Sequence, residues 1–139
     1  MNRQTQIGKA ERPAFILKEK IADMMKYGYP KTMKFCRKHR QLADEIRASM
    51  LACYKYAVRL EKKYFKQTTC QDLDIELDTL RHFVRMAADP DFEGPNFAPP
   101  LSRNEYRVWS EKLDEIGRLV GGYMDYIRRA QPRRTQSKR

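Results

Sequence analysis

Several features that commonly assign a protein to a functional class are absent from this 139-residue sequence or scarce in it. No run of about 18 apolar residues occurs, so we expect no membrane-spanning helix. Residues 1–13 hold no apolar segment of the signal-peptide type, which favours a cytoplasmic protein. Only three cysteines, without Cys-x-x-Cys spacing, and two histidines are present. These counts predict reduced thiols and no metal site.

The residue patterns of common enzymes are also missing. We find no glycine-rich phosphate loop, no Glu-x-x-His ligand pair and no Ser, His and Asp in a plausible arrangement. The neighbouring carboxylates Asp114 and Glu115 point about 100° apart on a helix, so they do not share a site. The sequence therefore predicts a protein that is not an enzyme, with no catalytic residue and no cofactor.

Acidic residues are scarce relative to basic ones, with 18 Asp and Glu against 29 Lys and Arg and a net charge of +11. The imbalance is local: residues 26–66 hold 12 basic and 3 acidic residues, whereas residues 72–93 hold 2 basic and 7 acidic. Residues 128–139 add 6 basic residues and no acidic one. Basic segments of this density bind phosphate groups through counterion release. A solvated face without a partner is the alternative interpretation.

Apolar residues recur in steps of three and four along four segments, which predicts helices at about 14–38, 41–65, 71–89 and 102–130. We expect the first helix to kink at Gly28-Tyr29-Pro30 and to continue beyond it. Thr69 is a candidate cap for the third helix, and Ser102 with Glu105 forms a capping box before the fourth. Acidic residues near the start of the third helix complement its dipole.

The remaining segments complete the predicted architecture. Residues 90–101 are a proline-rich loop, residues 1–13 a disordered arm and residues 131–139 a basic disordered tail. No segment alternates with period two, so the expected fold class is all-α, an antiparallel four-helix bundle spanning residues 14–130.

The fourth predicted helix combines a regular apolar stripe with three interior glycines, Gly117, Gly121 and Gly122. Together they cost about 2–3 kcal/mol relative to alanine, so we expect another backbone to approach closely. A neighbouring helix of the same bundle and a second subunit both satisfy this expectation. We assign Gly117 and Gly121 to packing within the bundle and Gly122 to a contact between subunits.

The candidate nucleic-acid-binding residues follow the basic segments: Lys31, Lys34, Arg37, Lys38, His39, Arg40, Arg59, Lys62, Lys63, Arg128 and Arg129. We expect His39 to supplement a phosphate contact and His82 to lie at the surface. Nearby aromatic residues can stack on unpaired bases, although core packing is the simpler interpretation of each one.

Four segments, "YGYP", "KFCRKHR", "LDIELDTLRHFVRMAAD" and "LSRNEYRVWSEKLDEIGRLVGGYM", occur in this order. In order and spacing they resemble the Avd family, the accessory variability determinants encoded beside the reverse transcriptases of diversity-generating retroelements. The resemblance covers roughly residues 15 to 128. It implies a basic homopentameric barrel without catalytic activity, which binds the reverse transcriptase and template RNA, with cDNA as a further candidate partner, during adenine-directed mutagenic cDNA synthesis. It also implies that Arg81 and Arg85 contact the transcriptase or the RNA.

The chain departs from the Avd pattern in its proline-rich loop, residues 89–101, and in its arginine-rich tail. A tolerated surface insertion and a specific contact both explain the loop. The alternative function is a structural four-helix bundle of the type encoded in 23S ribosomal RNA intervening sequences, with no reverse transcriptase partner. The high positive charge favours the Avd interpretation.

Overall fold

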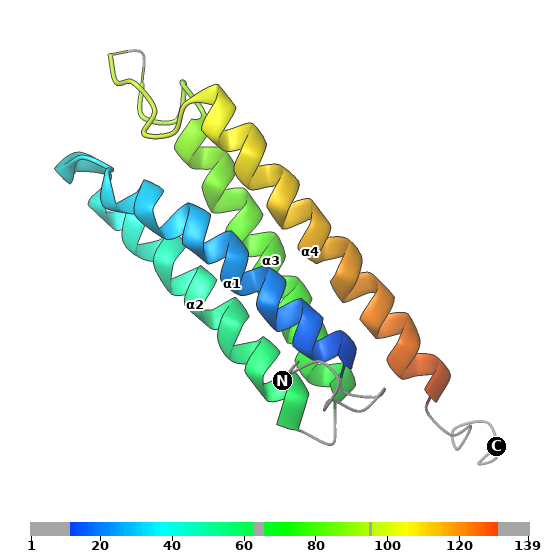
Figure 1. The fold of residues 1–139 in the computed structure, drawn as a ribbon. Helices are drawn as coiled ribbons and strands as arrows, with labels where there is room; N and C mark the ends of the chain where they lie inside the picture. Colours follow the sequence, from blue (N-terminus) through cyan, green and yellow to red (C-terminus); the bar gives the residue numbers. More distant parts are fainter. Residues whose placement is uncertain (1–11, 63–65, 95, 131–139) are drawn as a thin grey trace.

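The computed structural model describes residues 12–62, 66–94 and 96–130, which form four long helices side by side (Figure 1). The helices are α1 (Arg12–Met33), α2 (Arg40–Lys62), α3 (Lys66–Ala88) and α4 (Arg103–Ala130), with a short 3₁₀ turn, η2 (Arg37–His39), before α2. Each helix packs on its neighbours in chain order and α4 returns to α1. The described residues contain no strand, and the predicted four-helix bundle is confirmed.

The core is built from the apolar stripe that each helix turns inward, as the three- and four-residue spacing predicted. Its largest members are Leu17, Ile21 and Met24 of α1, Ile46, Met50 and Leu60 of α2, Leu73, Leu77 and Leu80 of α3, and Trp109 and Leu113 of α4. Burial also raises the pKa of the Cys53 thiol to about 12 and that of Cys70 to about 11. Among the described residues, no helix is long and apolar enough to cross a membrane.

The first helix continues through Pro30, as expected, but it ends at Met33 and not at residue 38. Its last turn tightens, because the N–H of Lys34 donates to Lys31 O at 3.1 Å and that of Phe35 donates to Thr32 O at 3.2 Å. Such i to i+3 bonds commonly close a helix. The predicted boundary was therefore wrong, and residues 34–39 form the reversal that leads into α2.

The third helix begins at Lys66, five residues earlier than predicted. Thr69 lies inside the helix and is buried, so it is not the cap that we expected. The first turn of α3 contains no acidic residue, and the acidic positions begin at Asp72. Because the helix dipole acts mainly on the first turn, it explains little of this charge pattern.

The predicted capping box at the start of α4 is confirmed. The backbone N–H of Ser102 donates to Glu105 Oε1 at 2.9 Å, and the N–H of Glu105 donates to Ser102 Oγ at 3.1 Å. The hydrogen bond from the Ser102 backbone is the largest cause that lowers the pKa of Glu105, and Lys31, 3.5 Å away, lowers it further.

Glu105→Gln is expected to lower the free energy of unfolding at pH 7 by about 0.3–1 kcal/mol, because it removes a negative charge from a helix N-terminus. A lowered pKa stabilises the fold above the ordinary pKa of a carboxyl group, and this stabilisation disappears as the pH falls through the folded-state value. Urea denaturation at pH 7 and at about pH 3 measures the difference. Glu111→Gln is the control, since its side chain is exposed. A loss that is equal at both pH values contradicts the assignment.

The set of glycines that lie against another side chain differs from the one predicted from the fourth helix alone. A Cβ atom added to Gly28 of α1 would overlap the Trp109 ring, and one added to Gly117 would overlap the guanidinium of Arg81. At Gly121 and Gly122 an added Cβ meets no described atom within 4 Å apart from its own stretch of helix. The close packing inside the bundle that we expected at Gly121 was therefore wrong. A subunit contact at Gly122 stays a prediction.

Candidate nucleic-acid interface

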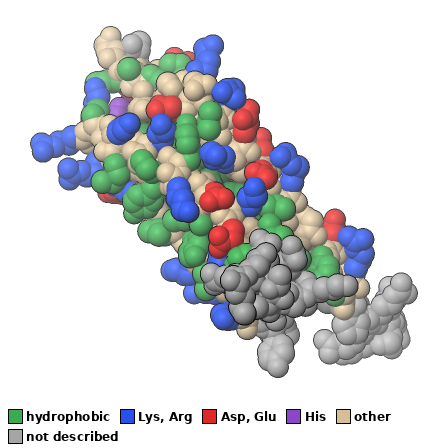
Figure 2. All heavy atoms as spheres, viewed as in Figure 1, with side chains coloured by type: hydrophobic (Ala, Val, Ile, Leu, Met, Phe, Trp, Pro, Cys, Tyr) green, Lys and Arg blue, Asp and Glu red, His purple; other side chains and the backbone are tan. Residues whose placement is uncertain are grey.

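Unpaired cations gather where α1 turns into α2. Lys34, Arg37, Lys38 and Arg40 are exposed, and none of them forms an ion pair with another described residue. Figure 2 shows Lys and Arg side chains projecting from this end of the molecule. We call these four residues the basic turn. Their charge is free to meet phosphate groups, because no carboxylate among the residues that the structure describes neutralises it.

Two other residues predicted for this site are engaged within the chain. Lys31 is partly buried, pairs with Glu105 at 3.5 Å and lies 4.9 Å from the centroid of the Tyr27 ring. His39 is only 3% exposed, and its Nδ1 lies 2.7 Å from Glu93 Oε1, close enough for an ion pair when the ring is protonated. A phosphate contact at His39 was therefore a wrong prediction, because the ring points into the protein and not into solvent.

The loop between α3 and α4 packs against the basic turn. Glu93 reaches His39, and the Lys38 Nζ atom lies 4.3 Å from the centroid of the Phe97 ring. The far end of the loop is held to α3, since the N–H of Leu101 donates to Ala87 O at 3.0 Å and the Leu101 side chain is buried. These contacts at both ends make the loop part of the same surface as the basic turn.

The other predicted cations at the ends of α2 and α4 lie at the opposite end of the bundle (Figure 1). Arg59 and Lys62 are exposed, and the Arg59 guanidinium lies 5.7 Å from the centroid of the Tyr56 ring. Arg128 pairs with Asp125 at 3.7 Å, and Arg129 donates to Asp125 O at 3.4 Å. Lys63 lies outside the described residues. The structure thus separates the predicted cations into two groups.

Arg81 and Arg85, one turn apart on α3, have different environments. Arg81 is partly buried: its Nη2 donates to the Leu113 carbonyl oxygen at 3.2 Å and lies 3.6 Å from Asp114 Oδ1. It thereby links α3 to α4 across Gly117, where the missing Cβ leaves room for the guanidinium. Arg85 is exposed and forms no ion pair with the described residues. Arg81 is therefore a packing residue, and only Arg85 offers an open cation.

Arg81→Glu is expected to lower the free energy of unfolding by about 1–3 kcal/mol, because it removes a hydrogen bond between helices and places a carboxylate near Asp114. The matched variant Arg85→Glu has the same charge change one turn away, and we expect an effect within about 0.5 kcal/mol. Urea denaturation of both variants gives the comparison. Equal effects would show that Arg81 does not hold the two helices together.

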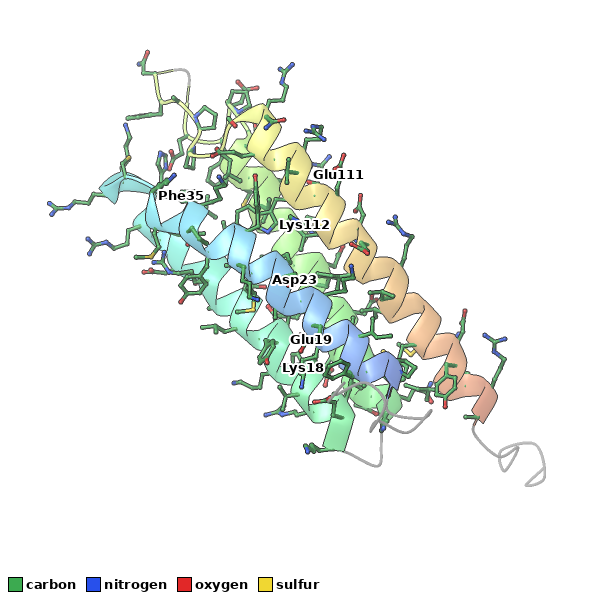
Figure 3. The ribbon with its side chains drawn as sticks, in the orientation of Figure 1. Lys18, Glu19, Asp23, Phe35, Glu111 and Lys112 are labelled. Atoms are coloured by element: carbon green, nitrogen blue, oxygen red, sulfur yellow. The ribbon has the colours of Figure 1, made fainter. Side chains whose placement is uncertain are left out.

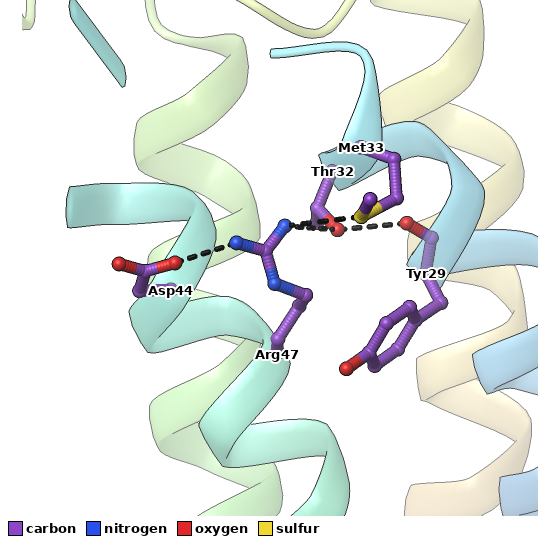
Figure 4. A network of polar contacts seen from close by, with 5 residues as sticks. All are labelled: Tyr29, Thr32, Met33, Asp44 and Arg47. Atoms are coloured by element: carbon purple, nitrogen blue, oxygen red, sulfur yellow. Dashed lines mark hydrogen bonds and ion pairs between the residues drawn. The ribbon is translucent and has the colours of Figure 1, made fainter. Parts of the chain in front are cut away.

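Several further cations are also bound internally, which charge counting did not reveal. Arg47 of α2 bonds Asp44, and its Nη1 lies 3.1 Å from Thr32 Oγ1 and 3.7 Å from Met33 Sδ of α1 (Figure 4). Two further cations labelled in Figure 3 are likewise engaged: Lys18 pairs with Glu61 at 2.8 Å, and Lys112 lies 5.5 Å from the Tyr27 ring centroid. These contacts hold neighbouring helices together and remove the cations from the candidate interface.

Two adjoining grooves along α3 and α4 do not resemble an active site. One groove of about 570 Å³ is lined by Asp74, Asp78 and Asp114 together with Arg81 and Arg118. No group of three or more His, Cys, Asp or Glu side chains in the described part of the chain is placed to hold a metal ion. His82, in the adjoining groove, is exposed as predicted, and its Nδ1–H donates to the Asp78 carbonyl oxygen of its own helix at 2.8 Å.

Comparison with models of known protein families gives a match for this bundle. The model described as bAvd-like matches residues 15–127, which is most of the chain and nearly all of the core. No curated protein matches the sequence.

Proposed function

The chain belongs to the bAvd-like family, and from this premise we propose that it is a non-enzymatic accessory protein of a diversity-generating retroelement. In this proposal it acts in the cytoplasm and binds the reverse transcriptase of the same element together with template RNA. Its role is to support adenine-directed mutagenic synthesis of cDNA, which it also contacts.

The observation that carries the proposal is the basic turn. Lys34, Arg37, Lys38 and Arg40 are exposed and unneutralised by other described residues, on a chain with a net charge of +11. Such a cluster attracts a polyanion over the distance of a Debye length and gains free energy when counterions leave the RNA. Arg85 lies near the same end of the bundle, where α3 finishes, and adds to this charge.

The transcriptase and a ring of identical subunits are the proposed protein partners. The acidic positions Asp72, Asp74 and Asp78 are exposed on α3, and Ile75 among them is 65% exposed. An acidic surface with an open apolar side chain is complementary to the basic faces of a neighbouring copy. A head-to-tail pairing of unlike surfaces closes into a ring when its rotation permits, which supports a ring; five is the subunit number that we propose from the family resemblance.

The test combines RNA binding with recovery of the transcriptase. We expect the purified protein to bind structured RNA at low salt, with an affinity that falls linearly with salt on a logarithmic scale. We also expect the transcriptase encoded beside the gene to co-purify with it. If RNA binding is undetectable at low salt, or if no transcriptase co-purifies, the proposal is wrong. A structural bundle of the ribosomal intervening-sequence type predicts that no transcriptase co-purifies.

A further inference from the structure

Phe97 is an exposed aromatic side chain beside the basic turn. It lies in the loop between α3 and α4, and its side chain is 44% exposed. The N–H of Phe97 donates to Gly94 O at 3.3 Å, which closes a local turn, and Gly94 has a φ of +104° that favours glycine. The backbone thus presents the ring outward at a defined position.

The position of the ring is fixed relative to cations. Lys38 Nζ lies 4.3 Å from the centroid of the Phe97 ring, within the range of a cation–π interaction. The contact of Glu93 with the buried His39 holds the same loop against η2. A flat apolar ring is therefore held next to Lys38, whose neighbours in the basic turn are Arg37 and Arg40, while much of its surface stays open to solvent.

We propose that Phe97 and the basic turn form a binding platform for single-stranded RNA, in which an unpaired base stacks on the ring while the cations contact the flanking phosphates. An aromatic face accepts any base, and cations beside it follow the backbone, so the pairing suits unpaired nucleotides with little preference for sequence. A base inside a duplex is already stacked and cannot reach the ring. The inference rests on the proposed function and names the form of RNA that this surface selects.

Phe92 provides an internal comparison in the same loop. It is 50% exposed, similar to Phe97, but its sequence neighbours are the carboxylates of Asp91 and Glu93. No described cation lies over its ring, and carboxylates beside it repel a phosphate backbone. Exposure alone would make the two rings equivalent, whereas the platform requires only Phe97.

The test compares Phe97→Ala with Phe92→Ala, using a fluorescently labelled single-stranded oligoribonucleotide and its fully paired duplex at fixed salt. We expect wild type to prefer the single strand, and Phe97→Ala to bind it more weakly by between about 5-fold and about 150-fold, the range for one stacked base. Phe92→Ala is expected to change the affinity less than about 2-fold. Duplex binding is expected to change little in either variant, since it depends on phosphate contacts.

A second readout reports stacking directly and does not depend on affinity. Trp109 is fully buried, so a tryptophan placed in the loop is the one that a ligand can quench. We expect the oligoribonucleotide to quench the fluorescence of Phe97→Trp and to leave that of Phe92→Trp unchanged. If Phe97→Trp binds the single strand without quenching, the inference is overturned.

Three other outcomes distinguish a failure of the proposed platform from a failure of the proposed function. Equal single-strand affinity for wild type and Phe97→Ala overturns the platform but leaves RNA binding intact. A Phe97→Ala protein that changes its oligomeric mass in light scattering overturns it as well, because the ring is then a subunit contact. If wild type binds neither RNA form at low salt, the proposed function itself fails.

Discussion

Trp109→Ala is expected to lower the free energy of unfolding by about 3–5 kcal/mol, the range for removing a large aromatic side chain from a core. The indole is fully buried, and its Nε1 donates to Met24 Sδ at 3.3 Å. The Tyr27 ring meets it edge-on, with 6.3 Å between the ring centroids. Both neighbours belong to α1, so the variant loses the buried aromatic contact that Trp109 makes between the first helix and the last. Urea denaturation followed by circular dichroism measures the loss.

At the same site, we expect the effect of Gly28→Ala on the free energy of unfolding to change sign when Trp109 is also replaced, which a double-mutant cycle measures. Gly28→Ala in the wild-type protein forces a Cβ atom into the Trp109 ring, which we expect to destabilise the fold by about 1–3 kcal/mol. In the Trp109→Ala background this overlap is gone, and the alanine is expected to stabilise the helix by about 0.5–1 kcal/mol through its higher helix propensity. Additive effects of the two substitutions would show that glycine is not required by the indole.

Trp109 and Gly28 illustrate which features of the fold the sequence predicts and which it does not. The apolar stripes of all four helices follow from spacing along one segment, and Trp109, Leu113, Ile116 and Val120 are buried as that spacing predicts. Gly28 meets a residue far along the chain, and no local pattern reveals such a partner. We therefore assigned the close approach to the glycines of the fourth helix, where, among the described side chains, only those near Gly117 come close to a glycine.

Charges at the candidate site are subject to the same limit, because a local pattern does not reveal partners that lie far along the chain. Counting charges along residues 26–66 identified the basic turn correctly as a dense region, because it depends on neighbours in sequence. Counting did not reveal that Lys31 and His39 meet Glu105 and Glu93 across the bundle end, since those carboxylates follow much later in the chain. The two helix boundaries that were wrong, at residues 38 and 71, depend on hydrogen bonds and burial that no periodicity encodes.

The double charge reversal Arg37→Glu with Arg40→Glu is expected to weaken binding of single-stranded RNA strongly. Each neutralised phosphate contributes about 0.7 to the logarithmic salt slope, so the loss of two contacts lowers the slope by about 1.4. If both proteins bind equally at about 1 M salt, this difference in slope makes the variant bind about 25-fold more weakly than wild type at about 0.1 M salt. Repulsion from the new carboxylates adds to that loss. Both residues are exposed and unpaired among the described residues, so we expect the fold to persist. Fluorescence anisotropy across a salt series measures slope and affinity together.

The matched control, Lys26→Glu with Arg107→Glu, changes the net charge of the protein by the same amount. Lys26 lies 3.9 Å from Asp23, and Arg107 lies 3.1 Å from Glu111, so both cations already have a carboxylate partner. If the basic turn contacts phosphate directly, only the Arg37 and Arg40 variant loses salt slope, because counterion release counts contacts and not the overall charge. An equal loss in both variants means that RNA responds to the total charge of the protein, and the basic turn is then not a specific interface.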